Sequence, residues 1–278
     1  MNNKHRKIKP GRVVIYILCI LAAVIMLIPF LWMVSASFKA KNEIFTNPIR
    51  WIPEVFRTVN YERIFNDIPF PTYFLNTFKI TLSITVLQLV TCSMAAYAFS
   101  KLKFPGRDKL FLAYLGTMMV PWHAVMIPQF IIIQKMGLYD NQLALILTGA
   151  FSAFGVFILR QNMMSIPDSL AEAAKIDGCG FFGIYTKIIL PLSKTGLITL
   201  GVLTFNSVWN DYMGPMIYLD TDKKKTIQLG LATFKRQYDT DYGAIMAGTV
   251  VSLIPIVIVY AIAQKYIVEG VANTGIKG

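Results

Sequence analysis

The sequence predicts an all-α polytopic membrane protein with six transmembrane helices. Of its 278 residues, 55% are hydrophobic and only 15% are charged, whereas a soluble domain carries about 25% charged residues. Apolar runs of about 20 residues, the length that spans a bilayer, recur along the chain. Lys and Arg gather in the polar segments between these runs, as they do beside membrane spans, so the net charge of +12 does not call for a nucleic-acid partner.

The first apolar run covers residues 13–35 and follows a basic N-terminal segment, residues 1–12. A secretory signal peptide has the same order of charged and apolar segments. This run is too long for a signal peptide and lacks a small-residue cleavage site. We therefore expect a retained first span, kinked near Pro29, with residues 1–12 in the cytoplasm.

Five further apolar runs follow. We expect spans at about 76–99, 110–133, 142–159, 195–219 and 244–266. Prolines interrupt the third and sixth runs, and the backbone groups that proline frees inside a membrane need partners from neighbouring helices or water. The runs are separated by two segments that are too polar to span, residues 36–74 and 220–243, and by shorter basic turns.

Six spans place both ends of the chain on one side of the membrane. The basic segments 1–12 and 101–109 predict that this side is the cytoplasm, because Lys and Arg near span ends are retained there. The C-terminal tail, residues 268–278, and the polar segment 160–194 between the fourth and fifth spans then also face the cytoplasm.

The segment between the fourth and fifth spans predicts two short helices. Ser169 stands three residues before Glu172, which is the spacing of a capping box at a helix start. Ser165 or Asp168, with Pro167 in the first turn, offers an alternative start. The sequence leaves both starts open.

The first of these helices carries Ala173 and Ala174, strong helix formers without bulk, which allow another surface to approach closely. Gly178 suits the left-handed conformation that ends a helix. A second, more apolar helix is expected over residues 179–190, and Pro191 is expected to end it.

These residues form a spaced pattern: Glu-Ala-Ala, three residues, Gly, nine residues, Ile, one residue and Leu-Pro. Every position is filled, by Glu172, Ala173, Ala174, Gly178, Ile188, Leu190 and Pro191. The pattern, placed between two spans, resembles the cytoplasmic coupling loop of membrane subunits in bacterial type I ABC importers. The alternative interpretation is a solvated amphipathic loop.

The resemblance implies a type I importer fold in which residues 72–267 form the transmembrane domain and residues 160–194 the coupling loop. It implies a multi-pass permease subunit of the bacterial cell membrane that pairs with a related permease as a heterodimer. Two ATPase subunits and an extracytoplasmic binding protein are the other implied partners. The chain has no Walker A pattern, so we expect it to be no enzyme and to bind no cofactor, with ATP and Mg held by the ATPase.

Softer similarities along the chain point to the maltose and multiple-sugar branch of these permeases. They include Trp209-Asn210-Asp211-Tyr212 and Leu229-Gly230-Leu231. The implied substrate is a sugar, with an oligosaccharide favoured, and the loop holding Leu229, Gly230 and Leu231 is the implied contact for the binding protein. An importer for glycerol phosphate or a polyamine is the closest alternative. A secondary transporter would need buried carboxylates for ion coupling, and only Asp211 qualifies.

Two acidic residues of the coupling segment carry alternative roles. Glu172 is expected either to contact the ATPase or to cap its own helix. Asp177 is expected either to bind a partner or to lie solvated at the turn.

Polar residues within spans are costly and therefore indicate function. The candidates for a substrate path are Asn206, Trp209, Asn210, Asp211 and His123. Amides and an aromatic ring on one helix face suit a sugar, whereas the structural alternative is that the asparagines bond across helices. A lone His in the spans cannot build a metal site, and the three cysteines show no metal spacing, so no metal and no disulfide are expected.

Overall fold

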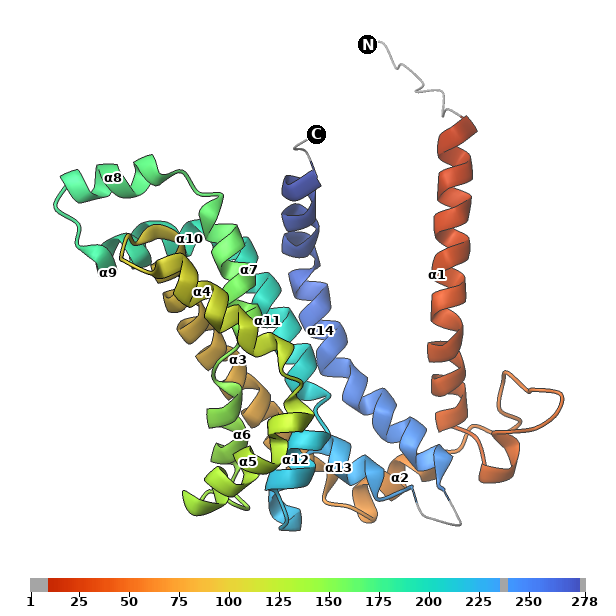
Figure 1. Ribbon diagram of the computed structural model, residues 1–278. Helices are drawn as coiled ribbons and strands as arrows, with labels where there is room; N and C mark the ends of the chain where they lie inside the picture. The colour runs from red at the N-terminus through yellow and green to blue at the C-terminus, as the bar shows by residue number, and fades with distance from the viewer. Residues whose placement is uncertain (1–9, 236–239, 276–278) are drawn as a thin grey trace. The chain divides into compact units, whose positions relative to one another are not determined.

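The computed structural model describes residues 10–235 and 240–275, which are almost entirely helical (Figure 1). Within these two stretches the only β structure is one bridge between Lys235 and Thr240. The predicted all-α class is therefore confirmed. The first part of the expected N-terminal segment, residues 1–9, and the last residues of the expected tail, 276–278, lie outside the described residues.

The chain divides into two compact units, Met1–Ile68 with Leu231–Val251 and Pro69–Gly230 with Ser252–Gly278. The first unit contains α1 (Pro10–Ser37), which corresponds to the expected first span. No residue of its most apolar 18-residue window is buried. A helix that is apolar on all sides suits a lipid environment.

Short helices follow α1, as expected for a segment too polar to span: η1 (Lys41–Glu43) and α2 (Val59–Asn66). The buried amide of Asn60 on α2 donates hydrogen bonds to the carbonyls of Ser37, at 2.9 Å, and Lys39, at 2.8 Å. The bond to Ser37 satisfies a carbonyl that α1 leaves free at its C-terminus, and the bond to Lys39 holds the chain just beyond it. They fix the chain's exit from the first span.

The second unit is built on three long helices: α3 (Phe70–Lys101), α7 (Ala153–Met164) and α11 (Lys194–Trp209). These helices pack along one another. Gly155 of α7 makes the close approach possible, because a Cβ atom there would lie 2.9 Å from Cys92 Sγ and 3.1 Å from Leu200 Cδ1. Helix packing in membranes favours such small residues at the contact.

The third expected span is interrupted, as the sequence predicts. It divides into α4 (Arg107–Gly116), η2 (Thr117–Met119) and α5 (Trp122–Lys135). The two halves are bent by 96° at the break. Pro121, which has no backbone N–H to donate, stands at the break, whereas Pro128 is accommodated inside α5.

The other spans differ from expectation mainly at their ends. The fourth comprises α6 (Gln142–Gly149) and α7, and the fifth comprises α11 followed by α12 (Met213–Tyr218). After η4 (Asp222–Lys224) and α13 (Ile227–Ala232), α14 (Tyr242–Gly275) forms the sixth. Because α14 continues to Gly275, it covers most of the segment expected as a tail.

The number of membrane crossings depends on how the bent helices are counted. In the described residues four candidates are long and apolar enough to cross a membrane. They are Gly11–Ser37, Phe70–Lys101, Gln142–Met164 and Tyr242–Tyr266. Two bent helix pairs, Arg107–Met119 with Trp122–Lys135 and Phe181–Leu192 with Lys194–Trp209, also pass the test. Counting each pair as one span raises the total to six, which is the number that the sequence predicts.

Side chains of α3 satisfy the backbone at the break between α6 and α7. Gln88 Nε2 donates to the carbonyl of Gly149 and Thr91 Oγ1 to that of Ala150, both at 2.7 Å. Cys92 Sγ lies 3.5 Å from the carbonyl of Ser152. A helix interruption within a membrane is tolerated when neighbouring side chains bind the freed backbone groups.

Candidate functional site: a short exposed helix and a cavity

The Glu-Ala-Ala sequence lies on a short helix, α8 (Asp168–Ile176). Pro167 occupies the N-cap position, and no side chain caps the helix start. The predicted capping box is therefore wrong, because Ser169 lies inside the first turn. The alternative start at Ser165 is also wrong, since that residue ends α7. The start at Asp168 is the observed one. Pro167, expected in the first turn, instead precedes it.

A lysine from the end of α3 anchors the start of α8 instead. Lys101 Nζ donates to the carbonyl of Ile166 and to Asp168 Oδ1, each at 2.6 Å. The Lys101 side chain is only 4% exposed, whereas that of Asp168 is 73% exposed. The hydrogen bond and the positive charge of Lys101 lower the pKa of the Asp168 carboxyl.

The end of α8 follows the Schellman pattern. Gly178 has φ +83°, the left-handed conformation that the sequence predicts for it. The N–H of Gly178 bonds to the carbonyl of Lys175 at 3.1 Å, and the N–H of Cys179 bonds to that of Ala174 at 2.9 Å. These two bonds satisfy carbonyls at the helix end and reverse the chain direction.

The two faces of α8 have different environments. Ala174 is 6% exposed and belongs to a hydrophobic core with Ile184 and Tyr185. Glu172 and Ala173 are exposed. The small side chain of Ala174 thus allows α8 to approach its own unit, whereas only Ala173 of the alanine pair is available to another protein.

The acidic residues of this segment are solvent-accessible. Glu172 lies in the second turn of α8 and does not cap it, so the capping interpretation is wrong and the contact role stays a prediction. Asp177 is the exposed C-cap residue. Its contact with a partner is also untested.

The second helical segment begins at Phe181, two residues later than expected. It consists of α9 (Phe181–Ile184), a π-helix (η3, Tyr185–Ile189) and α10 (Leu190–Leu192). Pro191 lies within its last turn and therefore does not end it, contrary to the prediction. The chain bends by 76° before α11, where Ser193 N–H bonds to the Ile189 carbonyl at 2.9 Å. Ile188 and Leu190 are partly buried in the core beneath α8.

Two tyrosines join this second segment to α3. Tyr97 OH donates to the Phe181 carbonyl at 3.0 Å, and Tyr185 OH bonds to Ser93 Oγ at 2.7 Å. Their rings are 5.3 Å apart. The segment after α8 is therefore fixed to the same helix that anchors its start.

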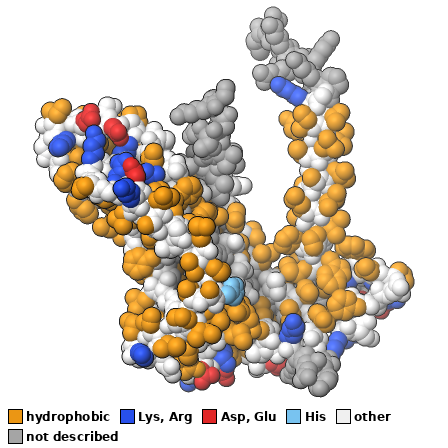
Figure 2. All heavy atoms as spheres, in the orientation of Figure 1, with side chains coloured by type: hydrophobic (Ala, Val, Ile, Leu, Met, Phe, Trp, Pro, Cys, Tyr) orange, Lys and Arg blue, Asp and Glu red, His pale blue; other side chains and the backbone are white. Residues whose placement is uncertain are grey.

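Charged side chains gather over the end of this unit that carries α8 (Figure 2). Arg160 shows how they are organised: its guanidinium bonds to the carbonyl of Phe99 at 3.1 Å and to Asp108 at 3.2 Å. Its guanidinium carbon lies 4.1 Å from the centroid of the Phe111 ring. Hydrogen bonding from Arg107, helped by the charge of Arg160, lowers the pKa of Asp108.

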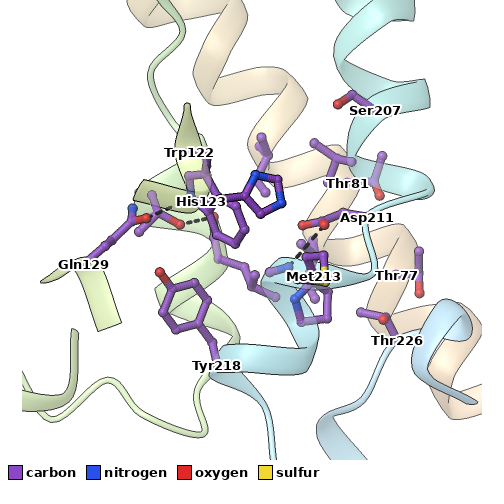
Figure 3. Close-up of a pocket in the computed structure, with 18 residues that line it drawn as sticks. Thr77, Thr81, Trp122, His123, Gln129, Ser207, Asp211, Met213, Tyr218 and Thr226 are labelled. Carbon is purple, nitrogen blue, oxygen red and sulfur yellow. Dashed lines mark hydrogen bonds between the residues drawn. The ribbon is translucent and has the colours of Figure 1, made fainter. Parts of the chain in front are cut away.

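A cavity of about 390 Å³ lies in the second unit among α3, α5, α6, α11 and α12 (Figure 3). His123 and Asp211, two residues that the sequence predicts for a substrate path, both line it. Asp211 Oδ1 also accepts a hydrogen bond from Gly214 N at 3.2 Å. The carboxylate therefore holds the start of α12 as well as facing the cavity.

The other three predicted path residues do not line this cavity. Trp209 is fully buried, and its indole N–H donates to Ser252, 3.0 Å from the carbonyl oxygen. Asn210 Nδ2 donates to the Asn206 carbonyl at 2.9 Å. This bond runs along one helix, so the observed contact is neither a bridge between helices nor part of the cavity wall.

Several polar residues of the cavity wall escaped the sequence analysis. They are Thr77, Thr81, Trp122, Gln129, Thr148, Ser207, Tyr218 and Thr226. A signal existed for Trp122, which directly follows the proline at a helix break. The threonines gave none, because an isolated threonine in an apolar run is ordinary.

The predicted contact for a binding protein lies on α13 and is largely buried. Leu229 is partly exposed and Gly230 is buried. Leu231 is 7% exposed, and its side chain reaches the space above Gly248. Whether this segment contacts a binding protein stays a prediction. Across the described residues no group of three His, Cys, Asp or Glu side chains could hold a metal ion.

Comparison with known proteins identifies the family. A family model described as "Binding-protein-dependent transport system inner membrane component" matches residues 90–273. The chain is 34% identical over 280 residues to the probable ABC transporter permease protein YurM of Bacillus subtilis, covering 99% of this chain and 91% of that protein. It is 34% identical over 259 residues to the arabinooligosaccharides transport system permease protein AraQ of Halalkalibacterium halodurans, covering 92% of this chain and 93% of that protein.

A solved structure supports the same assignment. It is the crystal structure of a bacterial ABC transporter involved in the import of the acidic polysaccharide alginate. One of its chains matches with a TM-score of 0.80 and 27% identity, covering 96% of this chain and 100% of that chain. The chain therefore belongs to the family of inner membrane components of binding-protein-dependent transport systems, multi-pass proteins of the cell membrane.

Proposed function

We propose that this chain is the permease subunit of an ATP-driven sugar importer and that α8 receives the movement of an ATPase. Relatives named for arabinooligosaccharide transport and the structural similarity to an alginate importer support a carbohydrate substrate, with an oligosaccharide favoured. The chain itself catalyses no reaction and binds no cofactor. ATP and Mg are held by the partner.

The construction of α8 is the observation on which the coupling role rests. Lys101 holds its start, the turn at Gly178 fixes its end, and Ala174 packs its inner face into the core. Its outer face presents Glu172 and Ala173 to solvent. A helix held on one side and accessible on the other can pass a displacement from a partner into its own unit.

The proposal requires a complex of several proteins. A related permease subunit completes the translocation path, and two ATPase subunits lie on the cytoplasmic side, which places α8 and both chain ends in the cytoplasm. An extracytoplasmic binding protein delivers the sugar. Glu172 and Asp177 supply exposed charges for the ATPase contact, and the loop around Leu229 lies on the side that meets the binding protein.

Transport then follows from differential binding. The ATPase dimer closes on ATP and moves α8, and the helices packed against it turn the path from inward-facing to outward-facing. A ligand shifts such an equilibrium only by its difference in affinity for the two states. In this scheme ATP supplies that difference through the ATPase, and the sugar released by the binding protein enters the opened path.

A matched pair of glycine variants tests the coupling role. Gly178→Val places a branched side chain at φ +83°, whereas Gly180→Val changes a nearby glycine with an ordinary φ of −74°. A left-handed conformation costs about 1–2 kcal/mol for a residue with a Cβ atom, more for a β-branched one. No heavy atom lies within 4 Å of either added Cβ, so the backbone conformation is the difference between the two variants.

Both variants are purified with their co-assembled partners and reconstituted in proteoliposomes. We expect Gly178→Val to insert and assemble but to lose sugar uptake relative to ATP hydrolysis, while Gly180→Val keeps both. Uptake by Gly178→Val at the wild-type rate, or recovery of the chain without any ATPase, would refute the proposal.

A further inference from the structure

The wall of the cavity contains buried hydroxyl groups that no protein group satisfies. Thr81, Tyr218 and Thr226 are 0%, 1% and 3% exposed, and in the described structure their hydroxyl oxygens have no hydrogen-bond partner. A buried polar group without a partner costs about 1–3 kcal/mol. The three residues belong to α3, α12 and the segment before α13, yet all line one cavity. Figure 3 labels all three around it.

Three interruptions of the spanning helices also meet at this cavity. Trp122 and His123 follow the break before α5, Gly149 precedes the break after α6, and Asp211 lies in the break between α11 and α12. Irregular backbone at membrane depth is tolerated where it is buried in protein or lines a cavity. In transporters, broken helices of this kind form substrate sites.

Apolar atoms form most of the cavity surface, and few of its side chains are ionisable. Of its 18 lining residues, Asp211 is the only acidic one, and none is Lys or Arg. Two like charges repel more strongly where water is scarce. An anionic solute, such as a uronate or a phosphate ester, would meet the Asp211 carboxylate without a Lys or Arg side chain to compensate its charge.

Trp122 contributes an aromatic ring to the cavity wall. The indole N–H of Trp122 donates to Gln129 Oε1 at 3.0 Å, so the ring is held in place and its polar group is already satisfied. Its apolar faces suit the C–H face of a sugar ring. The volume of about 390 Å³ lies at the small end of ligand pockets, about 300–1,000 Å³, as expected for one or two sugar rings.

We propose that this cavity binds a neutral sugar unit of the transported carbohydrate and that Asp211 excludes acidic sugars. The inference rests on the proposed function and deepens it, because it names the substrate class and the residue that selects it. The similar transporter of known structure is involved in the import of an acidic polysaccharide. This chain has a cavity suited to the opposite class.

Cysteine protection tests the site in the complete importer, reconstituted in nanodiscs. Ser207 is exposed and lines the cavity, whereas Asn210, on the same stretch of chain, is exposed and does not. Ser207→Cys is the probe and Asn210→Cys its matched control. A water-soluble thiol reagent modifies each variant, and mass spectrometry of the peptide containing the new cysteine separates it from the native ones.

The neutral probes are maltotriose, arabinotriose and N,N′-diacetylchitobiose, and the acidic probe is trigalacturonate. We expect the neutral sugar that the importer takes up to slow modification of the Ser207→Cys variant about tenfold at about ten times its Kd, because only about a tenth of sites then remain empty. The Asn210→Cys variant should be unaffected. Trigalacturonate should protect neither.

Two substitutions in the Ser207→Cys background separate the roles of the wall residues. Asp211→Asn keeps an oxygen to accept from Gly214 but removes the charge, and it should allow trigalacturonate to protect. Thr81→Val keeps the shape and removes an unpaired hydroxyl, and it should weaken protection by the neutral sugar. If Asp211→Asn fails to assemble, Thr81→Val decides the binding site, and the comparison of neutral and acidic sugars in the parent Ser207→Cys chain decides the exclusion of acidic sugars.

Three outcomes would overturn the inference: no modification of the Ser207→Cys variant by the water-soluble reagent, protection by spermidine but by no sugar, or equal protection by neutral and acidic sugars in the parent chain. Uptake of a neutral sugar without protection would overturn the cavity site and leave the proposed function intact. Protection in an assembly that imports no sugar would support the site and reject the proposed function.

Discussion

Replacing Lys101 with methionine should loosen α8 while leaving the membrane helices in place. Lys101 ends α3, and its ammonium binds the Ile166 carbonyl and Asp168 Oδ1 at 2.6 Å each. Methionine has a similar length and no charge, so it can occupy the space of the buried lysine side chain. The substitution removes both bonds to the start of α8.

The two bonds contribute unequally. A hydrogen bond to a charged group is worth about 1.5–3 kcal/mol, whereas an ion pair with an exposed partner contributes about 0–1 kcal/mol, and the Asp168 side chain is 73% exposed. The Ile166 carbonyl bond therefore carries most of the effect. A net loss of about 2 kcal/mol corresponds to a roughly 30-fold change in the population of the anchored arrangement.

Hydrogen exchange measures this population directly. In nanodiscs, the amides of α8 (Asp168–Ile176) should exchange up to about 30-fold faster in Lys101→Met, under conditions where the helix recloses faster than an opened amide exchanges. Sugar uptake per ATP hydrolysed should fall with it. Lys103→Met is the control, because Lys103 is exposed two residues away. Unchanged exchange in Lys101→Met, or equal acceleration in Lys103→Met, would refute the anchoring role.

Two further substitutions test the opposite end of the second unit. Gly214→Ala should destabilise the protein by about 1–3 kcal/mol in thermal denaturation, because the added Cβ would lie 2.5 Å from Asp211 Oδ2. Gly116→Ala is the control and should not destabilise it, because no atom lies within 4 Å of a Cβ at Gly116. Asp140→Asn should speed exchange in the loop after α12, because the Asp140 carboxylate accepts bonds from Lys224 and from backbone N–H groups of that loop. The Lys224 ammonium, with these other donors, lowers the pKa of Asp140, so its stabilisation is complete above the unfolded pKa of about 3.9 and is lost only as pH falls through the folded value. Wild-type exchange in this loop, corrected for the intrinsic rate, should therefore match at pH 5 and pH 7, and a difference would contradict this assignment.

The features predicted well from sequence are those with local causes. The turn at Gly178 needs a left-handed backbone, and glycine is the residue that adopts it without strain. The spans follow from apolar runs whose length a bilayer fixes. In each case the residues that determine the feature lie within the segment itself.

The capping box at the start of α8 was predicted wrongly because the group that anchors this start is distant in sequence. Ser169 and Glu172 have the spacing of a capping box, but the donor that holds this end is Lys101, 65 residues before Ile166. The buried ammonium fixes the carbonyl before the helix, so no side-chain cap is needed. Sequence spacing alone cannot distinguish these two solutions.

The broken spans have a similar explanation. A proline inside an apolar run predicts an interruption, but Pro121 stands at a 96° bend whereas Pro128 is accommodated within α5. Partners elsewhere in the fold decide which break is stable. The break after α6, which contains no proline, persists because Gln88 and Thr91 of α3 bind its carbonyls.

The cavity required the three-dimensional structure for another reason. His123 and Asp211 attract notice as ionisable residues in spans, whereas Thr81 and Thr226 are ordinary in sequence. Their significance lies in having no partner although they are buried. Tyr218 is the third such group, and these hydroxyls form a set only because α3 passes both α12 and the segment before α13.

Continuity of α3 gives the coupling proposal its physical basis. At one end Lys101 holds α8, one turn away Tyr97 holds α9, and further along Gln88 holds the break after α6. Thr81, on the same helix, lines the cavity. A displacement of α8 that leaves α3 behind must break several bonds, whereas one that carries α3 with it moves the cavity wall. Coupling between distant sites requires an element whose arrangement both sites bias, and α3 is the element of this unit that makes direct contacts with both.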